Sequence, residues 1–316
     1  MNLPTFENIQ QAHLRILKQI HHTPVHSSAS INDIAGIPVF FKCENFQKAG
    51  AFKYRGATNA VMALSEKETE KGVATHSSGN HAAALALAAR NKGMKCFVVM
   101  PRTAPKPKIE AVRFYGAEIT FCEPTLQSRE DTLKTIVKET GAVMIHPFDN
   151  FNVICGQGTA TKEFLEDISD LELLFVPVGG GGLLSGSAIA AKSLNPGIKV
   201  FGCEPANADD AYRSFRSGII HPSLNPNTLA DGLLTSLSEL TFTIIRKHVD
   251  DIYTVSEESI IHAMHLVWRR MKIIIEPSSA VPLAVILQNK GLFAGKKAGI
   301  IVSGGNVDLM NLPFHQ

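Results

Sequence analysis

The segment "LLFVPVGGGGLLSGSAIAAKSL", residues Leu173–Leu194, decides the fold of this chain because it joins an apolar strand to a helix through four successive glycines. Glycines in a row weaken strands and helices alike, so the backbone from Gly179 to Gly182 must adopt unusual dihedral angles or approach a ligand closely. The free N–H groups and the positive dipole end of a helix N-terminus favour phosphate. The segment therefore predicts a phosphate-binding loop after a buried strand.

The spacing of these glycines argues against two common nucleotide-binding loops. The patterns G-x-G-x-x-G and G-x-x-x-x-G-K-[ST] require glycine or lysine at positions where Leu183, Leu184, Ser185 and Ser187 stand. A single compact phosphate group suits the loop better than a dinucleotide or a P-loop nucleotide. The alternative is a tight turn that binds nothing.

Short apolar runs alternate with helical patterns along the whole chain. We expect strands in residues 39–44, 72–77, 96–100, 117–122, 142–147, 171–178, 198–204 and 297–305, and helices in 57–65, 82–93, 106–116 and 128–140. Such alternation predicts an α/β fold of parallel sheets with helices on both faces.

Two polar stretches suggest the limits of two lobes. The charged run "SEKETEKG" precedes the strand expected at Val73, and "HPFDNFN" begins where the apolar part of the strand expected at 142–147 ends, after Ile145. We predict a small domain of about four strands, residues 67–147, inserted into a large domain made of 1–66 and 148–316. A ligand would bind in the cleft between them.

Two more strand ends carry polar loops. Ser77, Ser78, Gly79 and Asn80 form a turn between a strand and a helix, and Ser303 begins the loop "SGGN" after the last strand. Parallel sheets bind ligands beyond the carboxyl ends of their strands, so these loops and the glycine loop are expected to face one crevice. Taken alone, the first turn is equally well explained as an ordinary helix cap.

The stretch "CEPANADDAY" brings several acidic groups together. Glu204 follows a strand, and Asp209 and Asp210 lie in the next turn. Carboxylates and backbone carbonyls at this spacing suit a hard cation such as magnesium. Acidic residues are also common at the start of a helix, and spacing alone favours that simpler reading.

The composition excludes several classes of protein. The formal net charge of +2 gives no electrostatic reason to expect nucleic acid or an anionic membrane as partner. The 5 cysteines form no C-x-x-C pair, which favours a reducing cytoplasm over a disulfide framework or zinc site. No stretch approaches the roughly 18 apolar residues of a membrane span, and the N-terminus does not resemble a secretory signal.

The stretch "KAGAFKYRGA" places Lys53 between two aromatic residues. By itself such a lysine is most simply a surface amine with a partly buried stem. With the serine-asparagine turn, the tetraglycine loop and the terminal serine in this order, however, the chain resembles the fold-type II pyridoxal-phosphate (PLP) enzymes of the serine/threonine dehydratase and serine racemase family. The similarity covers nearly the whole chain and includes "FKCENFQKAGAFKYRGA", "SSGNH", "HPFDNFNVICGQGT", "VPVGGGGLLSG", "EPANADDAY", "LADGL", "LVWRRMKIIIEPSSAV" and "VSGGNVDL".

The resemblance implies a two-lobed fold like that of the tryptophan synthase β chain, with PLP in the cleft between the lobes. Lys53 would carry the cofactor as a Schiff base and then remove the Cα proton of the substrate, and Ser78 would be the second acid/base on the opposite face. The other cofactor contacts would come from Phe52 and Gly232 on the two ring faces, Asn80 at the phenolic oxygen, Gly179, Gly180, Gly181, Gly182 and Leu183 at the phosphate, and Ser303 at the pyridine nitrogen. The substrate carboxylate would be bound by Ser77, Ser78, Asn80 and His81.

The family also implies a divalent cation, magnesium or manganese, held by Glu204, the Ala208 carbonyl and Asp210. Homodimers are usual among its members. In animal serine racemases the positions matching Ala49 and Ala83 carry a threonine and a glutamine of a nucleotide-activation site. Because both polar groups are absent here, we expect no strong activation by ATP.

The function implied is a cytoplasmic PLP-dependent L-serine/L-threonine ammonia-lyase, which forms pyruvate or 2-oxobutanoate and ammonia by β-elimination from a small hydroxy amino acid. Serine racemase or threo-3-hydroxyaspartate dehydratase is the alternative on the same site. A lysine amine attacks an aldehyde only when neutral, so a desolvated pocket close to other positive charge should lower its pKa. A catalytically silent relative and a phosphosugar isomerase are more distant alternatives.

Overall fold

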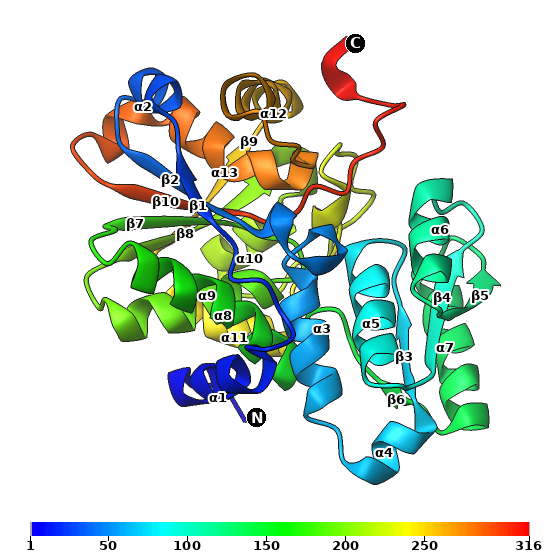
Figure 1. The fold of residues 1–316 in the computed structure, drawn as a ribbon. Helices are drawn as coiled ribbons and strands as arrows, with labels where there is room; N and C mark the ends of the chain where they lie inside the picture. Colours follow the sequence, from blue (N-terminus) through cyan, green and yellow to red (C-terminus); the bar gives the residue numbers. More distant parts are fainter. Residues whose placement is uncertain (1, 316) are drawn as a thin grey trace.

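The computed structural model describes residues 2–315 and contains two separate sheets (Figure 1). The six-stranded sheet has the order β1-β2-β10-β7-β8-β9 and consists of β1 (Val25–Ser27), β2 (Val39–Cys43), β7 (Leu173–Pro177), β8 (Lys199–Pro205), β9 (Asp251–Val255) and β10 (Ala298–Val302). The four-stranded sheet has the order β5-β4-β3-β6 and consists of β3 (Val73–His76), β4 (Cys96–Pro101), β5 (Glu118–Cys122) and β6 (Val143–Met144). Every pairing is parallel except that of β1 with β2, so the α/β prediction is confirmed.

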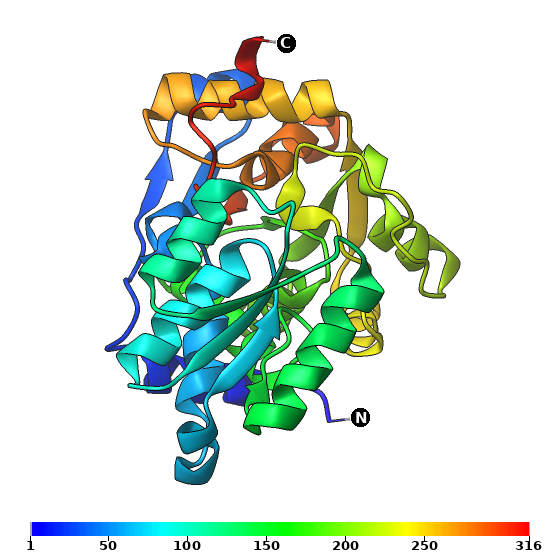
Figure 2. The same ribbon diagram turned by 90° about the vertical axis from the view of Figure 1, so that its right-hand side faces the viewer.

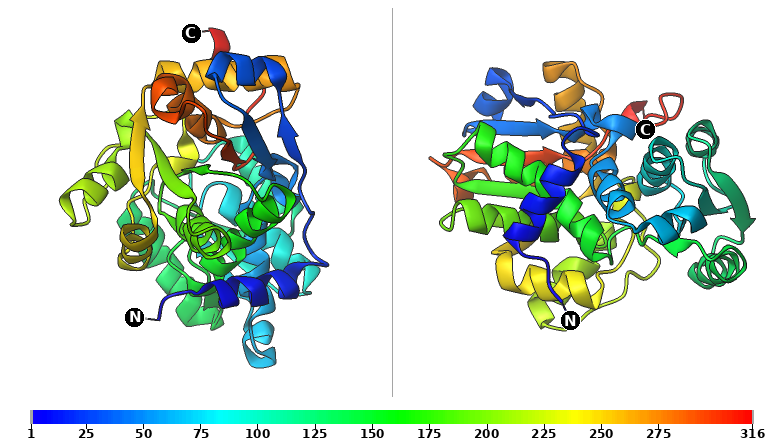
Figure 3. Two further views of the ribbon diagram at one scale, coloured as in Figure 1. Left: turned by 90° about the vertical axis from the view of Figure 1, so that its left-hand side faces the viewer. Right: turned by 60° about the horizontal axis from the view of Figure 1, so that its bottom comes forward.

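Helices cover both faces of the six-stranded sheet. The α-helices are α1 (Phe6–Ile16), α2 (Ala29–Ala35), α3 (Lys53–Met62), α4 (Glu66–Lys71), α5 (Asn80–Asn91), α6 (Lys106–Phe114), α7 (Leu126–Thr140), α8 (Phe151–Asp167), α9 (Gly182–Leu194), α10 (Asp210–Ser217), α11 (Glu239–His248), α12 (Glu257–Met271) and α13 (Pro277–Gln288). Short 3-10 turns are η1 (Glu44–Phe46), η2 (Lys48–Gly50), η3 (Ala206–Ala208), η4 (Asp231–Leu233), η5 (Lys290–Phe293) and η6 (Pro313–His315). One apolar core packs α2, α12 and α13 on one face, and another packs α8 and α9 on the other (Figures 1 and 3).

The two sheets use different parts of the chain. The four-stranded sheet is formed by one continuous stretch from β3 to β6, and the six-stranded sheet takes its strands from before and after that stretch. Figure 2 views the molecule from the side of the smaller sheet, with α12 running across the top. The domain limits at 66/67 and 147/148 stay predictions, since sheet membership does not define them.

Helix α3 begins at Lys53, four positions before the expected start at Ala57. Glycine usually weakens a helix interior. In the structure Gly56 lies inside α3 where α8 passes closely: a Cβ there would lie 2.5 Å from Gln157 Nε2 and 2.7 Å from the Val153 carbonyl oxygen. The glycine is therefore required for helix packing, and Lys53 occupies the first turn.

Candidate active site

Lys53 lies half-buried at the start of α3. Its Nζ donates a hydrogen bond to the Pro147 carbonyl at 2.9 Å and lies 5.1 Å from the centroid of the Phe52 ring. Loss of solvation lowers the pKa of Lys53 to about 8, while the Glu276 carboxylate opposes this shift. The structure agrees with the expectation that the pKa of Lys53 is lowered. It does not agree with the expectation that nearby positive charge contributes, because the charge that acts on Lys53 is the negative charge of Glu276.

A buried ion-pair network fixes the helix that carries Lys53. The guanidinium of Arg55 donates to Glu44 (Nε to Oε2, 2.7 Å) and to Glu163 (Nη2 to Oε2, 2.7 Å), and all three side chains are almost inaccessible to solvent. Glu44 begins η1 directly after β2, and Glu163 lies on α8. Two carboxylates therefore hold α3 in one orientation relative to the larger sheet.

The backbone N–H groups of the glycine loop are not used in hydrogen bonds within the part of the protein that the structure describes. None of the N–H groups from Gly179 to Leu184 donates to a carbonyl among residues 2–315, and the first bond of α9 runs from Ser185 to Gly181. Gly181 has φ of 84°, which a residue with a side chain rarely adopts. A Cβ at Gly180 would overlap the Phe148 ring. Free donors at the start of a 13-residue helix suit a phosphate.

Asn80 joins the two lobes through a chain of side-chain bonds. Its Nδ2 donates to Glu276 Oε1 at 2.9 Å, and its Oδ1 accepts from Asn306 Nδ2 at 2.9 Å. Burial, with a smaller contribution from Asp231, raises the pKa of Glu276 to about 7. The segment before Glu276 is held by Trp268, whose Nε1 donates to the Ile275 carbonyl at 3.0 Å.

Two serines lie at the end of the last strand. Ser303 is 2% exposed, and its hydroxyl is 2.9 Å from that of Ser279. Ser279 Oγ also bonds to both the N–H and the carbonyl of Gly304, at 2.8 Å each. The hydroxyl of Ser303 therefore has a fixed position beside the carboxyl end of β10.

The turn before α5 presents backbone donors, but the His81 side chain faces away from solvent. His81 is 2% exposed, and its Nε2 is 3.2 Å from the Ile145 carbonyl. Burial lowers its pKa to about 3. Ser77, Ser78 and Asn80 are partly exposed, and the first bond within α5 runs from Ala83 to Gly79. The N–H groups of Ser77 and Gly79 are already bonded, to the Val99 carbonyl and to Ser77 Oγ. A carboxylate could be bound by the N–H groups of Ser78, Asn80 and His81, with His81 contributing only its backbone.

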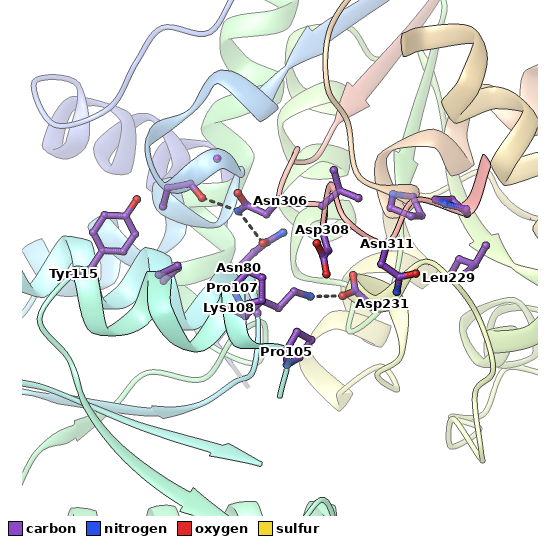
Figure 4. A pocket seen from close by; sticks show the side chains of 18 residues that line it. Asn80, Pro105, Pro107, Lys108, Tyr115, Leu229, Asp231, Asn306, Asp308 and Asn311 are labelled. Atoms are coloured by element: carbon purple, nitrogen blue, oxygen red, sulfur yellow. Dashed lines mark hydrogen bonds and ion pairs between the residues drawn. The ribbon is translucent and has the colours of Figure 1, made fainter. Parts of the chain in front are cut away.

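A cavity of about 520 Å³ opens between the two sheets beside this turn (Figure 4). Asn80, Lys108, Asp231 and Asn306 line it, and Lys108 forms an ion pair with Asp231 across it. Lys108 belongs to α6 and Asp231 to η4, next to Gly232. This pair links the two lobes at the opening of the cleft.

The acidic cluster lies apart from the cavity. Glu204 accepts hydrogen bonds from the N–H groups of Ala211 (3.0 Å) and Tyr212 (2.8 Å). Asp210 is 1% exposed, and neither of its carboxylate oxygens has a partner in the described part of the chain. Burial raises the pKa of both carboxyls, that of Asp210 to about 6, and their mutual repulsion raises that of Glu204 further. Among residues 2–315 no three His, Cys, Asp or Glu side chains could share a metal, so a cation would also need main-chain oxygen.

The fold and this cleft define a cofactor-dependent α/β enzyme. The chain belongs to the pyridoxal-phosphate-dependent enzymes, since the family model described as "Pyridoxal-phosphate dependent enzyme" matches residues 16–304. It is 50% identical to the β-hydroxyaspartate dehydratase of Paracoccus denitrificans, with 100% of each chain covered. The crystal structure of serine racemase from Dictyostelium discoideum is 53% identical, with a TM-score of 0.93 over 96% of this chain and 99% of that one. The maize serine racemase structure is 45% identical, with a TM-score of 0.96 over 98% of this chain and 95% of that one.

These comparisons confirm the predicted family, its PLP cofactor and the fold-type II α/β fold. The described residues fit the cofactor, because a half-buried amine, N–H groups without acceptors and a fixed serine hydroxyl lie close together. Pro147 accepts from Lys53, the next residue Phe148 packs against Gly180, and the Phe52 N–H donates to the Ser303 carbonyl at 2.9 Å. The individual roles assigned to the site residues stay predictions. Glu276 was missed as a site residue, because its partner Asn80 lies 196 positions away in the sequence.

Proposed function

We propose that the protein is an ammonia-lyase that eliminates water from L-serine and L-threonine and releases a 2-oxo acid and ammonia. The observation that carries the proposal is Lys53, whose half-buried amine lies beside the Pro147 carbonyl and the Phe52 ring with its pKa lowered to about 8. PLP, when bound, supplies an electron sink for negative charge at Cα. Lys53 then takes the Cα proton, and the N–H groups of Ser78, Asn80 and His81, which have no acceptor among residues 2–315, hold the substrate carboxylate.

The remaining predicted residues complete this assignment. Gly179, Gly180, Gly181, Gly182 and Leu183 bind the phosphate, Phe52 and Gly232 enclose the ring, and Asn80 and Ser303 bind its polar atoms. Ser78 holds a proton on the face opposite Lys53, so return of that proton before loss of hydroxide would give the D-amino acid. Serine racemisation is therefore the alternative outcome on the same residues.

The test is a product assay. Purified holoenzyme is incubated with L-serine and with L-threonine, and 2-oxo acid and D-amino acid are measured over the same period. We expect 2-oxo acid to predominate and Lys53→Ala to abolish it. Predominant D-serine with little pyruvate would overturn the lyase assignment, and unchanged activity in Lys53→Ala would overturn the site.

A second candidate substrate is 3-hydroxyaspartate, favoured by the position of Arg129. The Nε atom of this arginine is buried and has no hydrogen-bond partner within residues 2–315. Its charge acts on His76, at the end of β3 directly before the Ser77 turn, and on Cys122 at the end of β5. A guanidinium there suits the second carboxylate of a dicarboxylic substrate. Relatives such as the Paracoccus enzyme carry hydroxyaspartate in their names.

Arg129→Met separates the two substrates. If 3-hydroxyaspartate is preferred, the variant should lose kcat/KM for this substrate by roughly tenfold or more, the effect of a lost charged hydrogen bond. Its kcat/KM for L-serine should change little. Equal loss for both substrates would contradict a role in recognising the second carboxylate.

We also propose that Glu204, the Ala208 carbonyl and Asp210 bind magnesium or manganese. The two oxygens of Asp210 without partners support this assignment, because buried carboxylates are normally paired. Added Mn²⁺ should raise the midpoint of thermal unfolding in the wild type and have no effect in Asp210→Asn. An equal rise in the variant would exclude this site.

Activation by nucleotide is not part of the proposal. Ala49 and Ala83 both line the cavity and offer no polar side-chain atom there. With saturating Mg²⁺ already present, millimolar ATP should leave the rate of 2-oxo acid formation nearly unchanged. A large rise would contradict this prediction.

A homodimer and a cytoplasmic location complete the proposal. The resemblance to the family supports the first, and the free thiols of Cys43, Cys96, Cys122, Cys155 and Cys203 support the second. No helix within the described residues is long and apolar enough to cross a bilayer. Light scattering of the purified protein and cell fractionation test the two statements.

A further inference from the structure

A tight turn between β6 and α8 is organised by the side chain of His146. Its Nδ1 accepts hydrogen bonds from the N–H of Asp149 at 2.9 Å and the N–H of Phe148 at 3.4 Å. Asparagine and aspartate commonly accept bonds from the backbone two residues on and so close a turn. Here the imidazole does the same. Because Nδ1 accepts two N–H groups, the neutral ring carries its proton on Nε2.

This turn contacts both parts of the cofactor site. On one side the Pro147 carbonyl accepts the bond from Lys53 Nζ at 2.9 Å. On the other side the Phe148 ring lies so close to Gly180 that a Cβ there would overlap it, and a Cβ at Gly182 would lie 3.0 Å from that of Phe148. The turn therefore lies between the amine and the phosphate-binding glycines.

We propose that His146 is a positioning residue for the cofactor site, whose Nδ1 acceptor fixes the turn at residues 147–149 and thereby the spacing of Lys53 and the glycine loop. The ring itself is held in place. It packs edge-on against Phe148, with centroids 4.6 Å apart, and against His76, with centroids 5.7 Å apart. Burial and the neighbouring His76 lower the pKa of His146 to about 4, so Nδ1 remains an acceptor at neutral pH.

Variants of His146 can separate the effect of its hydrogen-bond acceptor from the effect of its shape. Asparagine places Oδ1 at the same number of bonds from the backbone as histidine Nδ1, so His146→Asn keeps the acceptor while removing the ring. His146→Leu keeps much of the apolar volume and removes the acceptor. His146→Gln keeps a polar amide but moves it one bond further out. The three variants thus separate the acceptor from packing and from polarity.

The experiment measures PLP binding to the full-length apoprotein, which depends on the family assignment but not on the substrate proposed above. Apoprotein is titrated with PLP and followed by visible absorbance. In parallel, borohydride reduction and mass spectrometry give the fraction of Lys53 modified at each concentration. Far-UV circular dichroism and the thermal midpoint of each apoprotein establish that it is folded.

We expect His146→Leu and His146→Gln to weaken PLP binding roughly tenfold to a hundredfold, since two backbone donors lose their acceptor. His146→Asn should bind within a few-fold of the wild type. Wild-type affinity in folded His146→Leu would overturn the proposal, as would equal losses in the asparagine and glutamine variants. If the leucine variant does not fold, the comparison of asparagine with glutamine decides. A normal PLP result with no 2-oxo acid produced would refute the lyase assignment alone.

Discussion

The reactive amine of Lys53 is governed by two opposing effects. Removal from solvent lowers its pKa because the charged form loses hydration, and Glu276 raises it because the opposite charge stabilises the ammonium. Burial has the larger effect, and the pKa falls to about 8. At neutral pH a fraction of the Lys53 amine is therefore neutral, which is the form that its proposed attack on the cofactor aldehyde requires.

The rate at which apoprotein captures PLP should therefore depend on pH. Only the neutral amine reacts, so the rate should rise roughly tenfold per pH unit well below the Lys53 pKa and level off above about 8. In Glu276→Gln the opposing carboxylate is gone, the Lys53 pKa falls further, and the profile should shift to lower pH. Stopped-flow absorbance measures both profiles. A shift to higher pH in the variant would contradict the assigned sign.

Some site residues could be predicted from local sequence patterns. Others could not, because their contacts join segments that are far apart in the chain. The glycine loop and the serine-asparagine turn stand out because each needs a special backbone or residue type within a few positions, whereas Lys53 was identified only through the resemblance of the whole chain to a family. Glu276 and His146 act through contacts with segments far away in the chain or through a turn that the sequence does not mark as functional. Side-chain contacts of this kind depend on how the two sheets are placed.

Packing of α3 against α8 links the amine-bearing helix to the larger lobe. Gly56 N donates to Gln157 Oε1 at 3.2 Å, and a Cβ at Gly156 of α8 would lie 2.6 Å from the Gly56 Cα. Close approach of two helices through glycine leaves no room for added atoms. The same contact explains why the start of α3 could not be located from propensity alone.

Gly56→Ala should accordingly destabilise the protein by about 1–3 kcal/mol, the usual cost of overpacking, despite the higher helix propensity of alanine. Urea unfolding of the apoprotein measures the change. Gly291→Ala is the matched control, since its Cβ would meet no atom within 4 Å. Equal stability of the Gly56 variant and the wild type would show that α3 and α8 can separate without cost.

At the scale of the whole molecule, the ion pair between Lys108 and Asp231 spans the opening between the lobes (Figure 4). The two side chains are 24% and 47% exposed, so salt screens their attraction and its contribution is modest. An attraction of this strength favours the closed cleft without preventing it from opening. We therefore expect the ion pair between Lys108 and Asp231 to lower the frequency with which α6 separates from η4.

Asp231→Asn should raise hydrogen exchange in α6 roughly twofold to fivefold, as expected for loss of an exposed ion pair. Added salt should produce a similar rise in the wild type and little in the variant. Glu166→Gln, which removes the partner of Lys162 on α8, serves as control. A rise of the same size in α6 for the control variant would show that the effect is not specific to the cleft.

The general architecture was more accessible from the sequence than its details. Alternating apolar runs and helical patterns identified most strands, because parallel strands buried on both faces are almost continuously apolar, as in β7. The short edge strand β1 and the half-exposed edge strand β9 lack this pattern and were missed. The relative placement of the two sheets depends on long-range packing that no local pattern encodes.

Trp268 is the only tryptophan in the chain, and its indole N–H donates a hydrogen bond to the carbonyl of Ile275, the residue before Glu276. When excitation selects indole over the 4 tyrosines, the fluorescence of this protein therefore comes from one ring, hydrogen-bonded to the segment that carries the buried carboxylate. PLP bound through lysine absorbs close to the wavelengths at which indole emits, so energy transfer would quench this single emitter as the cofactor enters. The native chain thus contains its own optical reporter of cofactor occupancy, with no need for a label.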